Sequence, residues 1–406
     1  MPTYKPGDHQ IVAIVLKMID RGMPVDVGLW NDTIEETERN AARLEQEALE
    51  LAPEHPRGLG WKLHANYSPH TKPENRRDGK LALELKGYEA RDMKVPTLTE
   101  LAAQTGDEFV TRLMIYRQER NALNRLQKWP ANHIHSGRIH ARLNPYGTET
   151  GRITTAEPNL QGLDRKRPEW RKCIRAPEGK KILKADLNQI ELRILAKVSG
   201  DEALKSIYTE GRDLHALTAE RAVGHPVAKD SPERSIAKTV NFALAYGGTA
   251  WTIRDRLLKE GVIKPLEEIE QFVRGFFEAF PGVESWQERF GERDPDEEDA
   301  FVTHSLLGRR RIVGVVKSGY WKGYPKREER LNGPIQATGS DILKMILKRL
   351  SKEEEHHPHA RLLLSAHDEV VLEVDEGYED DAVSWVKGVM REAVEEVLGS
   401  ELGGPG

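Results

Sequence analysis

The sequence has almost no cysteine and no long apolar run, and each absence excludes a class of protein. Cys173 is the only cysteine among 406 residues, which rules out an internal disulfide and a cysteine-based zinc site. No run of about 18 apolar residues is present, so a membrane-spanning helix is excluded. The first ten residues lack the charged start and apolar stretch of a signal peptide. We therefore expect a protein of a reducing, cytoplasmic compartment with no membrane association.

The chain also lacks an excess of positive charge, although its basic residues are locally concentrated. The net charge is −5, and 38% of the residues are hydrophobic, which favours a globular protein. Basic residues gather between positions 165 and 175 and at 309–311, whereas acidic residues gather at 292–300 and 353–355. Such segregation is compatible with nucleic-acid binding. A solvated surface is the alternative for any single cluster.

Hydrophobic periodicity predicts a mixed α+β protein. Two long charged helices with an irregular segment between them suggest an arm rather than a catalytic core. A hairpin is expected at the end of the chain, with His367 and Asp368 at its tip. The segments from which we derive this organisation are helices over 10–50 (interrupted at 21–28), 107–129 and 380–398, β-structure with turns over 134–155, a strand over 180–187 followed by a helix that ends at Gly200, and a mainly helical region over 201–290.

Two aspartates lie where a metal site could form. Asp186 ends an apolar strand, and Asp368 lies at the hairpin tip. Two carboxylates held this way could bind two Mg²⁺ ions, whose remaining positions substrate phosphates and water would fill. The alternative for a single strand-end aspartate is a turn cap. Glu369 could be an auxiliary ligand or an ordinary surface acid.

A helix over 234–247 has its own chemistry. Arg234, Lys238, Phe242 and Tyr246 follow one another at i+4 spacing, which places them along one face. Two cations followed by two rings fit a nucleoside triphosphate, with the phosphates on the cations and the sugar and base on the rings. A helix with an aromatic core stripe and a solvated basic end is the alternative.

These motifs and several others occur in an order that resembles family A DNA polymerases, the class of bacterial DNA polymerase I and its phage relatives. The resemblance is strong over about 130–380 and weak before it. The segments that carry it are TETGRITTAEPNLQG (148–162), DLNQIELR (186–193), GRDLHALTA (211–219), RSIAKTVNFALAYGG (234–248), LLGRRR (306–311), NGPIQATGSDI (332–342) and AHDEVVLEV (366–374). One departure is Leu187, where the family usually has an aromatic residue.

The resemblance implies a right-hand polymerase fold with an antiparallel-sheet palm, helical fingers and a helical thumb. The implied divisions are 1–135 for the N-terminal helices and thumb, 136–204 for the first part of the palm, 205–330 for the fingers (with 234–248 as the O-helix-like element) and 331–406 for the second part of the palm.

The resemblance also implies roles for individual residues. Metal ligands would be Asp186, Asp368 and the backbone of Leu187, holding two Mg²⁺ ions for which Mn²⁺ can substitute. Lys238 would also protonate the leaving pyrophosphate, Glu369 would assist catalysis, and Glu191 would be the steric gate against a ribose 2′-OH. Phe242 implies discrimination against dideoxynucleotides. The remaining residues implied for dNTP binding are Arg234, His215, Tyr246 and Gln189, and those implied for the primer–template are Arg152, Asn332, Gln336, His367, Thr148, Asn159 and Gln161.

The function implied is template-directed extension of a DNA primer with dNTPs, in replication or repair, by a monomer in a bacterial cytosol or nucleoid or a phage-infected cell. No DxE motif occurs in residues 1–140, so we expect neither a 3′–5′ nor a 5′–3′ exonuclease in this chain. One alternative is a single-subunit RNA polymerase, against which Glu191 argues because a carboxylate gate disfavours ribose. The other is a non-catalytic DNA-binding subunit, against which the retained aspartates and cations argue.

Overall fold

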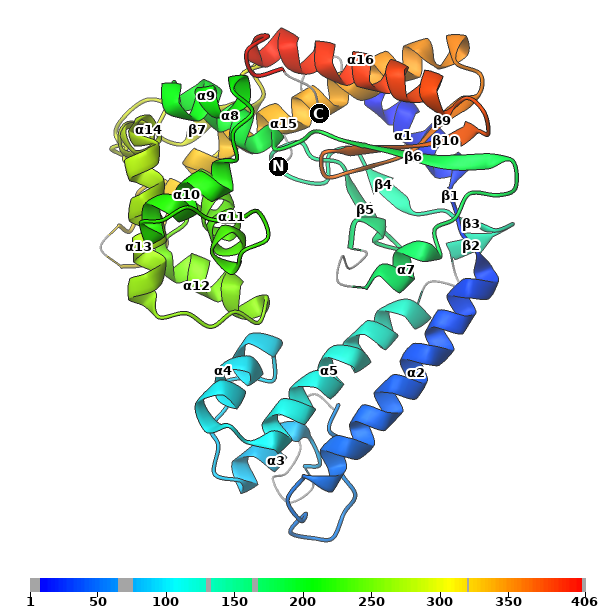
Figure 1. The fold of residues 1–406 in the computed structure, drawn as a ribbon, viewed down its shortest axis with the longest axis vertical. Helices are drawn as coiled ribbons and strands as arrows, with labels where there is room; N and C mark the ends of the chain where they lie inside the picture. Colours follow the sequence, from blue (N-terminus) through cyan, green and yellow to red (C-terminus); the bar gives the residue numbers. More distant parts are fainter. Residues whose placement is uncertain (1–7, 65–75, 129–132, 163–166, 320, 404–406) are drawn as a thin grey trace. The chain divides into compact units, whose positions relative to one another are not determined.

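The computed structural model describes residues 8–64, 76–128, 133–162, 167–319 and 321–403 (Figure 1). The chain forms two compact units. The first contains Met1–Val25, His135–Ile253 and Pro265–Gly406, and the second contains Asp26–Ile134 and Arg254–Lys264. The first 25 residues thus differ from the expected division at 135, because they belong with the part of the chain that holds the main sheet. Arg165 and Lys166 of the basic cluster lie outside the described residues.

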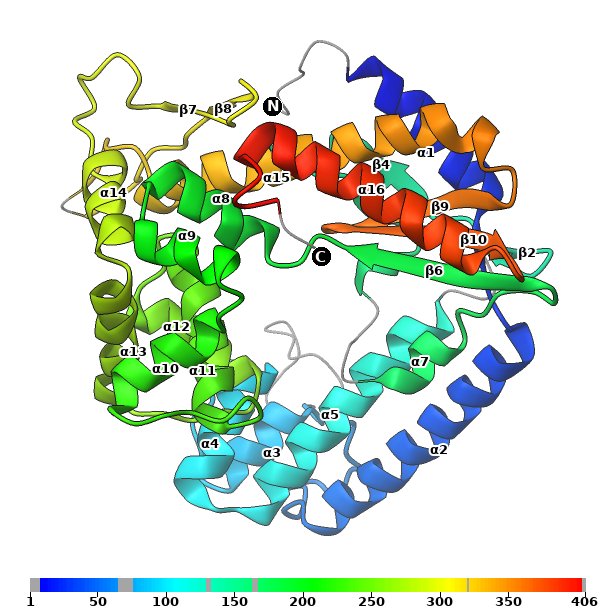
Figure 2. The ribbon, with the colours of Figure 1, turned by 45° about the horizontal axis from the view of Figure 1, so that its top comes forward.

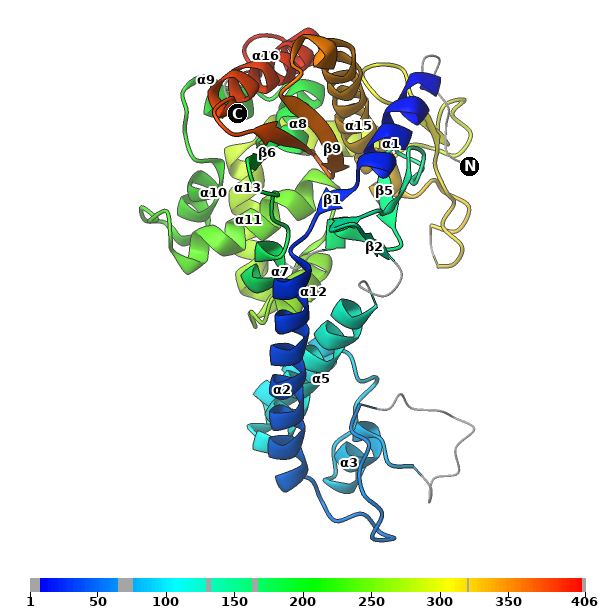
Figure 3. The same ribbon diagram turned by 90° about the vertical axis from the view of Figure 1, so that its right-hand side faces the viewer.

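The second unit is helical. Aspartates cap three of its helices: the side chains of Asp26, Asp78 and Asp107 accept hydrogen bonds from first-turn amides of α2, α3 and α5. α2 and α5 lie side by side, as Figure 3 shows, and share a core that includes Phe109 and Tyr116. These two helices agree with the arm-like pair expected from the sequence. The helices are α2 (Val27–Glu50), α3 (Gly79–Leu85), α4 (Val95–Thr105) and α5 (Glu108–Gln127).

The first unit contains a three-stranded antiparallel sheet. β10 (Glu369–Asp375) lies in the middle, with β6 (Lys180–Asp186) on one side and β9 (Ala360–Ala366) on the other. The apolar sequence of β10 is buried from Glu369 to Val374, as a central strand requires. The strand expected at 180–187 and the hairpin expected around His367 and Asp368 are therefore confirmed.

Helices pack on this sheet and on one another (Figure 2). α16 contacts β6 and β10, α1 contacts β9, and α15 packs against both α1 and α16. The amphipathic pattern of α1 accounts for its place, because Ile11, Ile14, Val15 and Met18 form one buried face. The three helices are α1 (His9–Arg21), α15 (Arg327–Glu353) and α16 (Glu379–Leu398).

A mainly helical segment follows β6, as expected for 201–290. α8 ends at Gly200, which has the left-handed conformation of a helix C-terminus. α10 packs against α11 and α13, and Ser231 caps α11 with Pro232 in its first turn. The helices are α8 (Ile190–Ser199), α9 (Glu202–Thr209), α10 (Leu214–Val223), α11 (Pro232–Ala245), α12 (Ala250–Lys259), α13 (Leu266–Ala279) and α14 (Pro281–Gly291).

Short elements complete the chain. β4 and β5 are paired and enclose the turn that carries part of the TETGRITT motif. In the described residues, no helix is both long enough and apolar enough to span a bilayer. The short elements are β1 (Met23–Pro24), β2 (Ile134–His135), β3 (Arg138–Ile139), β4 (Arg142–Asn144), β5 (Thr154–Ala156), η2 (Leu160–Gly162), α7 (Pro168–Lys172), β7 (Val302–His304), β8 (Arg310–Ile312) and η3 (Glu354–His356).

Candidate active site

Strand pairing brings the two motif aspartates together although they are far apart in the sequence. Asp186, the last residue of β6, lies opposite Glu369, the first residue of β10. The next residues continue the contact, since the Leu187 amide donates a 3.0 Å hydrogen bond to the Asp368 carbonyl. Asp368 lies in a two-residue turn that begins at His367, whose φ of 58° is left-handed. Asp186 is exposed and Asp368 is half-buried.

The oxygen donors at this edge fit a divalent cation such as Mg²⁺. Burial raises the pKa of Asp368, and the neighbouring Glu369 carboxylate adds to this effect. A cation here would relieve that concentration of negative charge. The Leu187 carbonyl accepts from the Ile190 amide at 3.0 Å and retains a second lone pair. In the part of the chain that the structure describes, no group of three or more His, Cys, Asp or Glu could hold a metal, so phosphates and water would have to complete the shell.

Glu369 is held by a cation on the neighbouring strand. Its Oε1 lies 2.7 Å from Lys184 Nζ, and the side chain of Glu369 is largely buried. Residues at i and i+2 of a strand share a face, so Lys184 and Asp186 lie on the face that Glu369 also occupies. This pairing favours a role for Glu369 in shaping the charge around the aspartates.

A pocket beside Asp368 joins residues from five distant segments. It is lined by Arg152, Glu191, Tyr246 and His367, together with Asp368, Ile190, Gly339 and Ser340. Arg152 Nη2 makes a hydrogen-bonded ion pair with Glu191. Burial, and then the Asp368 carboxylate, raise the pKa of Glu191 to about 7. The pocket therefore places the expected gate residue next to an expected metal ligand.

Gln189, expected at the dNTP, has a local role in this structure. It precedes α8 in a left-handed conformation, with a φ of 54°. Its Oε1 accepts a 3.3 Å hydrogen bond from the Tyr208 hydroxyl. The Tyr208 ring also packs against the Arg193 guanidinium, whose Cζ lies 4.5 Å from the centre of the ring. These contacts fix the turn between Asp186 and Glu191.

The four residues predicted on one face of α11 are present on that helix and at its end. Arg234 is in the first turn and Tyr246 follows the last residue. Arg234 Nε donates a 2.7 Å hydrogen bond to Asp213 Oδ2, whereas the Lys238 side chain is exposed. Burial opposes ionisation of Asp213, but the bond from Arg234 holds the pKa of this carboxyl below its usual range. Asp213 therefore orients a phosphate-binding candidate.

His215 is buried behind α11. Its Nδ1 lies 3.0 Å from the Asn241 amide nitrogen, and its ring centre is 5.9 Å from that of Phe242. Burial lowers the pKa of His215 to about 4; Asp213 opposes this shift, and Arg234 and Lys238 add to it. His215 is thus neutral at physiological pH. The Asn241 contact makes Nδ1 the acceptor and leaves Nε2 as the donor.

Acidic pH should destabilise the protein through His215. The unfolded chain binds the proton with a pKa near 6.5, whereas the folded protein resists it until about pH 4. Since the unfolded state binds more protons between these values, the free energy of unfolding should fall by about 2 kcal/mol from pH 7.5 to 5 because of this group. Urea unfolding of wild type and His215→Gln at both pH values measures the difference. The exposed His225→Gln is the control, and an equal pH dependence in wild type and His215→Gln would contradict this assignment.

Most of the residues expected at the primer–template support the turn between β4 and β5 and the hairpin tip. Thr148 Oγ1 accepts a 2.9 Å bond from the Arg152 amide. Gln336 Oε1 accepts from Thr150 Oγ1 at 3.4 Å, and Asn332 lies one turn earlier on α15. Further contacts are made by Asn159 Oδ1 with Thr155 Oγ1 (2.9 Å), Gln161 Nε2 with the Ile153 carbonyl (3.1 Å) and His367 Nε2 with the Gln161 carbonyl (3.3 Å).

Three site features were not predicted from the sequence. Asp213 lies in the same motif as His215, directly before α10. Because aspartate is a preferred N-cap, this position could have been predicted from the sequence. Asn241 gave no signal, since an amide inside a helix has no distinctive pattern. The pairing of Arg152 with Glu191 joins two motifs that were interpreted separately.

Comparisons with known proteins agree on one family. The model of DNA polymerase family A matches residues 30–400. Among curated proteins, the chain is 33% identical over 400 residues to the thermostable DNA polymerase I of Thermus filiformis (96% of this chain, 46% of that protein). It is 32% identical over 401 residues to that of Thermus aquaticus (95% and 45%). The DNA polymerase I of Lactococcus lactis subsp. cremoris is 30% identical over 402 residues (95% and 43%). The chain spans about half the length of these relatives.

A solved structure has the same fold. The POL domain of Pol1 from M. smegmatis, in complex with DNA primer-template and dNTP, superposes with a TM-score of 0.78. The match covers 94% of this chain and 66% of that chain at 24% sequence identity.

Proposed function

Since the chain belongs to DNA polymerase family A, we propose that it extends a DNA primer along a template, adding dNTPs to the primer 3′-OH and releasing pyrophosphate. The observation that carries the proposal is the edge where β6 meets the β9–β10 hairpin. There Asp186 lies opposite Glu369, and the adjacent Asp368 lines a pocket with Glu191, Arg152 and Tyr246. We assign 136–204 and 331–406 to the palm, together with the first 25 residues, whose helix α1 packs on β9 and α15, 205–330 to the fingers and 26–135 to the thumb.

The carboxylates of Asp186 and Asp368, with the Leu187 carbonyl, would hold Mg²⁺. When bound, this cation supplies charge neutralisation of the phosphates and a more acidic 3′-hydroxyl. Backbone pairing at the sheet edge keeps the main chains of Asp186 and Asp368 next to each other. Lys184 holds Glu369 beside them and limits its repulsion of the aspartates.

The triphosphate would lie along α11. Arg234 is oriented by Asp213, so its remaining N–H groups could meet the phosphates. Neutral His215 would donate from Nε2 to a phosphate oxygen without adding charge. Lys238 is exposed and ends in an ammonium group, which makes it the candidate for giving a proton to the leaving pyrophosphate.

Sugar selection would depend on Glu191. Its side chain is held by Arg152 and lies in the pocket beside Asp368 and Tyr246. A ribose 2′-OH at this place would meet the Glu191 side chain, whereas a deoxyribose would not. Closure of α11 on a correct base pair would make selection depend on induced fit.

Shortening Glu191 should admit ribonucleotides. We expect Glu191→Ala to raise the efficiency of rNTP incorporation relative to dNTP by about 10- to 100-fold, because the steric barrier to the 2′-OH is removed. Single-nucleotide incorporation with dGTP and GTP opposite cytosine measures the ratio. Glu191→Gln keeps the side-chain length and should retain most of the selectivity. Unchanged sugar selection in Glu191→Ala would contradict the assignment of Glu191 as the steric gate.

Binding of DNA would depend mainly on contacts with phosphates and on hydrogen-bond donors that do not distinguish one base pair from another. Minor-groove acceptors occupy similar places in every Watson–Crick pair, so Gln336, Asn332 and Arg152 could test pair geometry without sequence preference. Affinity for primer–template should fall steeply with salt. We place this activity in the cytoplasm, in replication or repair.

Extension of a labelled primer with Mg²⁺ tests the proposal, with dNTPs and rNTPs in parallel reactions. Full extension with dNTPs only supports a DNA polymerase. Extension with rNTPs as well favours the RNA-polymerase alternative, and tight DNA binding without extension favours a non-catalytic subunit. The same gel without nucleotides tests our proposal that this chain shortens neither end of the DNA.

A further inference from the structure

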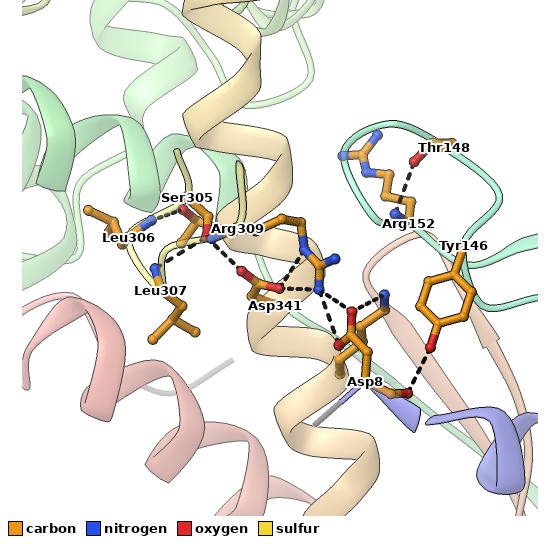
Figure 4. Close-up of polar contacts among 11 residues, drawn as sticks. Asp8, Tyr146, Thr148, Arg152, Ser305, Leu306, Leu307, Arg309 and Asp341 are labelled. Atoms are coloured by element: carbon orange, nitrogen blue, oxygen red, sulfur yellow. Dashed lines mark hydrogen bonds and ion pairs between the residues drawn. The ribbon is translucent and has the colours of Figure 1, made fainter. Parts of the chain in front are cut away.

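A buried charged cluster lies next to the candidate active site, in the same structural unit. Arg309 precedes β8, and its side chain is completely buried. Its Nε donates to Asp341 Oδ1 of α15 at 2.8 Å, and its Nη2 donates to Asp8 Oδ2 at 2.9 Å (Figure 4). The two aspartates are almost completely buried as well.

Ser305 completes the geometry of the cluster. Its hydroxyl donates to Asp341 Oδ2 at 2.6 Å and accepts from the Arg309 amide at 2.9 Å. The second Asp341 oxygen therefore also has a donor. Buried ion pairs are not in general more stabilising than apolar packing, because removing charges from water is costly. What such a network provides is a fixed orientation of the Arg309 guanidinium.

The guanidinium packs against the turn between β4 and β5. Gly151 there has a φ of 81°, and a Cβ added to it would lie only 2.8 Å from Arg309 Nε and 2.9 Å from its Cζ. The same turn is attached to the cluster a second time, because the Tyr146 hydroxyl donates to the Asp8 carbonyl at 2.9 Å. The cluster therefore contacts this turn at two places, Tyr146 and Gly151.

The residue after Gly151 is Arg152, the partner of Glu191. Figure 4 shows the turn, with Thr148 and Arg152, beside Arg309. We propose that Arg309 is a positioning residue, which sets the place of Arg152 and, through it, of the Glu191 gate beside Asp368. The inference rests on the proposed function, and it assigns a catalytic consequence to a residue that touches no substrate.

Two substitutions change this contact from opposite sides. Arg309→Lys keeps the charge but loses the two-pronged donor, so the turn loses its support. Gly151→Ala keeps Arg309 but places a methyl group where the guanidinium lies, in a backbone conformation that favours glycine. A displacement of about 1 Å near reacting groups can cost up to about 100-fold in rate. We expect both variants to lower the ratio of dNTP to rNTP incorporation by about tenfold, and to lower kcat more than they raise KM.

Arg330 offers a matched control. It is also completely buried, and it donates from Nε to the Phe290 carbonyl (3.0 Å) and from Nη1 to the Asp299 carbonyl (3.1 Å), not to the Gly151 turn. Arg330→Lys removes a guanidinium of the same burial, so its unfolding temperature should fall as that of Arg309→Lys does. Its ratio of dNTP to rNTP incorporation should remain that of the wild type.

The deciding experiment is a double-mutant cycle of Arg309→Lys with Arg152→Ala, read out by the dNTP to rNTP ratio. If Arg309 acts through Arg152, Arg309→Lys changes the ratio in the wild type and has no further effect in Arg152→Ala. Equal effects in both backgrounds, or an equal change in Arg330→Lys, would overturn the inference. If Arg309→Lys fails to fold, Gly151→Ala enters the same cycle in its place. A wild-type chain that extends no primer would instead overturn the proposed function.

Discussion

Asp368→Asn should abolish primer extension while primer–template binding persists. The substitution keeps the size of the side chain and removes the charge that would hold a divalent cation at the hairpin tip. A bound cation would supply several kcal/mol of transition-state stabilisation, so its loss should lower kcat by about 10³-fold or more. Asp186→Asn should have the same effect, because the two aspartates lie at one sheet edge and would hold the cation together.

Single-turnover extension gives the rate, and fluorescence anisotropy of a labelled primer–template gives the Kd. Binding should change by less than about threefold, since most of the affinity comes from phosphate contacts elsewhere. Glu369→Gln is the control: it lies in the same turn region, but its partner is Lys184 and its effect should be smaller. A retained rate above about a tenth of wild type in Asp368→Asn would contradict the metal assignment.

Lys238→Ala should reduce kcat by about 10²- to 10³-fold. The lysine lies on the α11 face between Arg234 and Phe242, and it is exposed, so it is available to a bound triphosphate. Proton donation by a positioned group contributes about 10²- to 10⁴-fold, and loss of its positive charge adds to the effect. The measurement is the single-turnover rate at saturating dNTP.

Two variants separate proton donation from charge in this case. Lys238→Arg keeps the charge but donates a proton poorly because the pKa of a guanidinium is well above that of an ammonium group, so it should recover dNTP affinity without recovering kcat. Lys352→Ala, which removes an exposed lysine from the end of α15, should behave as wild type. Full recovery of kcat in Lys238→Arg would show that Lys238 acts by charge alone.

Local patterns in the sequence determined the elements that carry the site. The apolar run ending at Asp186 predicts β6, and the two apolar runs around His367 and Asp368 predict the hairpin, because strand formation and tight turns depend on neighbouring residues. The i+4 spacing of Arg234, Lys238 and Phe242 predicts one face of α11 for the same reason. These predictions needed no knowledge of which segments would meet.

The sequence predicted less about where elements belong. α1 has an amphipathic pattern that is compatible with any apolar surface, and the expected division at 135 placed it with the arm. In the structure it packs on β9 and α15, and the first 25 residues belong to the other unit. A stripe of apolar residues specifies that a face will be buried, but not by which partner.

Only the tertiary structure decided the contacts that tune the site. Arg152 meets Glu191, Arg234 meets Asp213, and Arg309 joins Asp8 to Asp341, a pair separated by most of the chain. Each residue type has many possible partners, and pairing depends on how distant elements pack rather than on spacing along the chain. The sequence by itself therefore determined which chemical groups are present and on which elements they lie. The fold decided which of these groups touch, which are buried, and hence which of them have shifted pKa values.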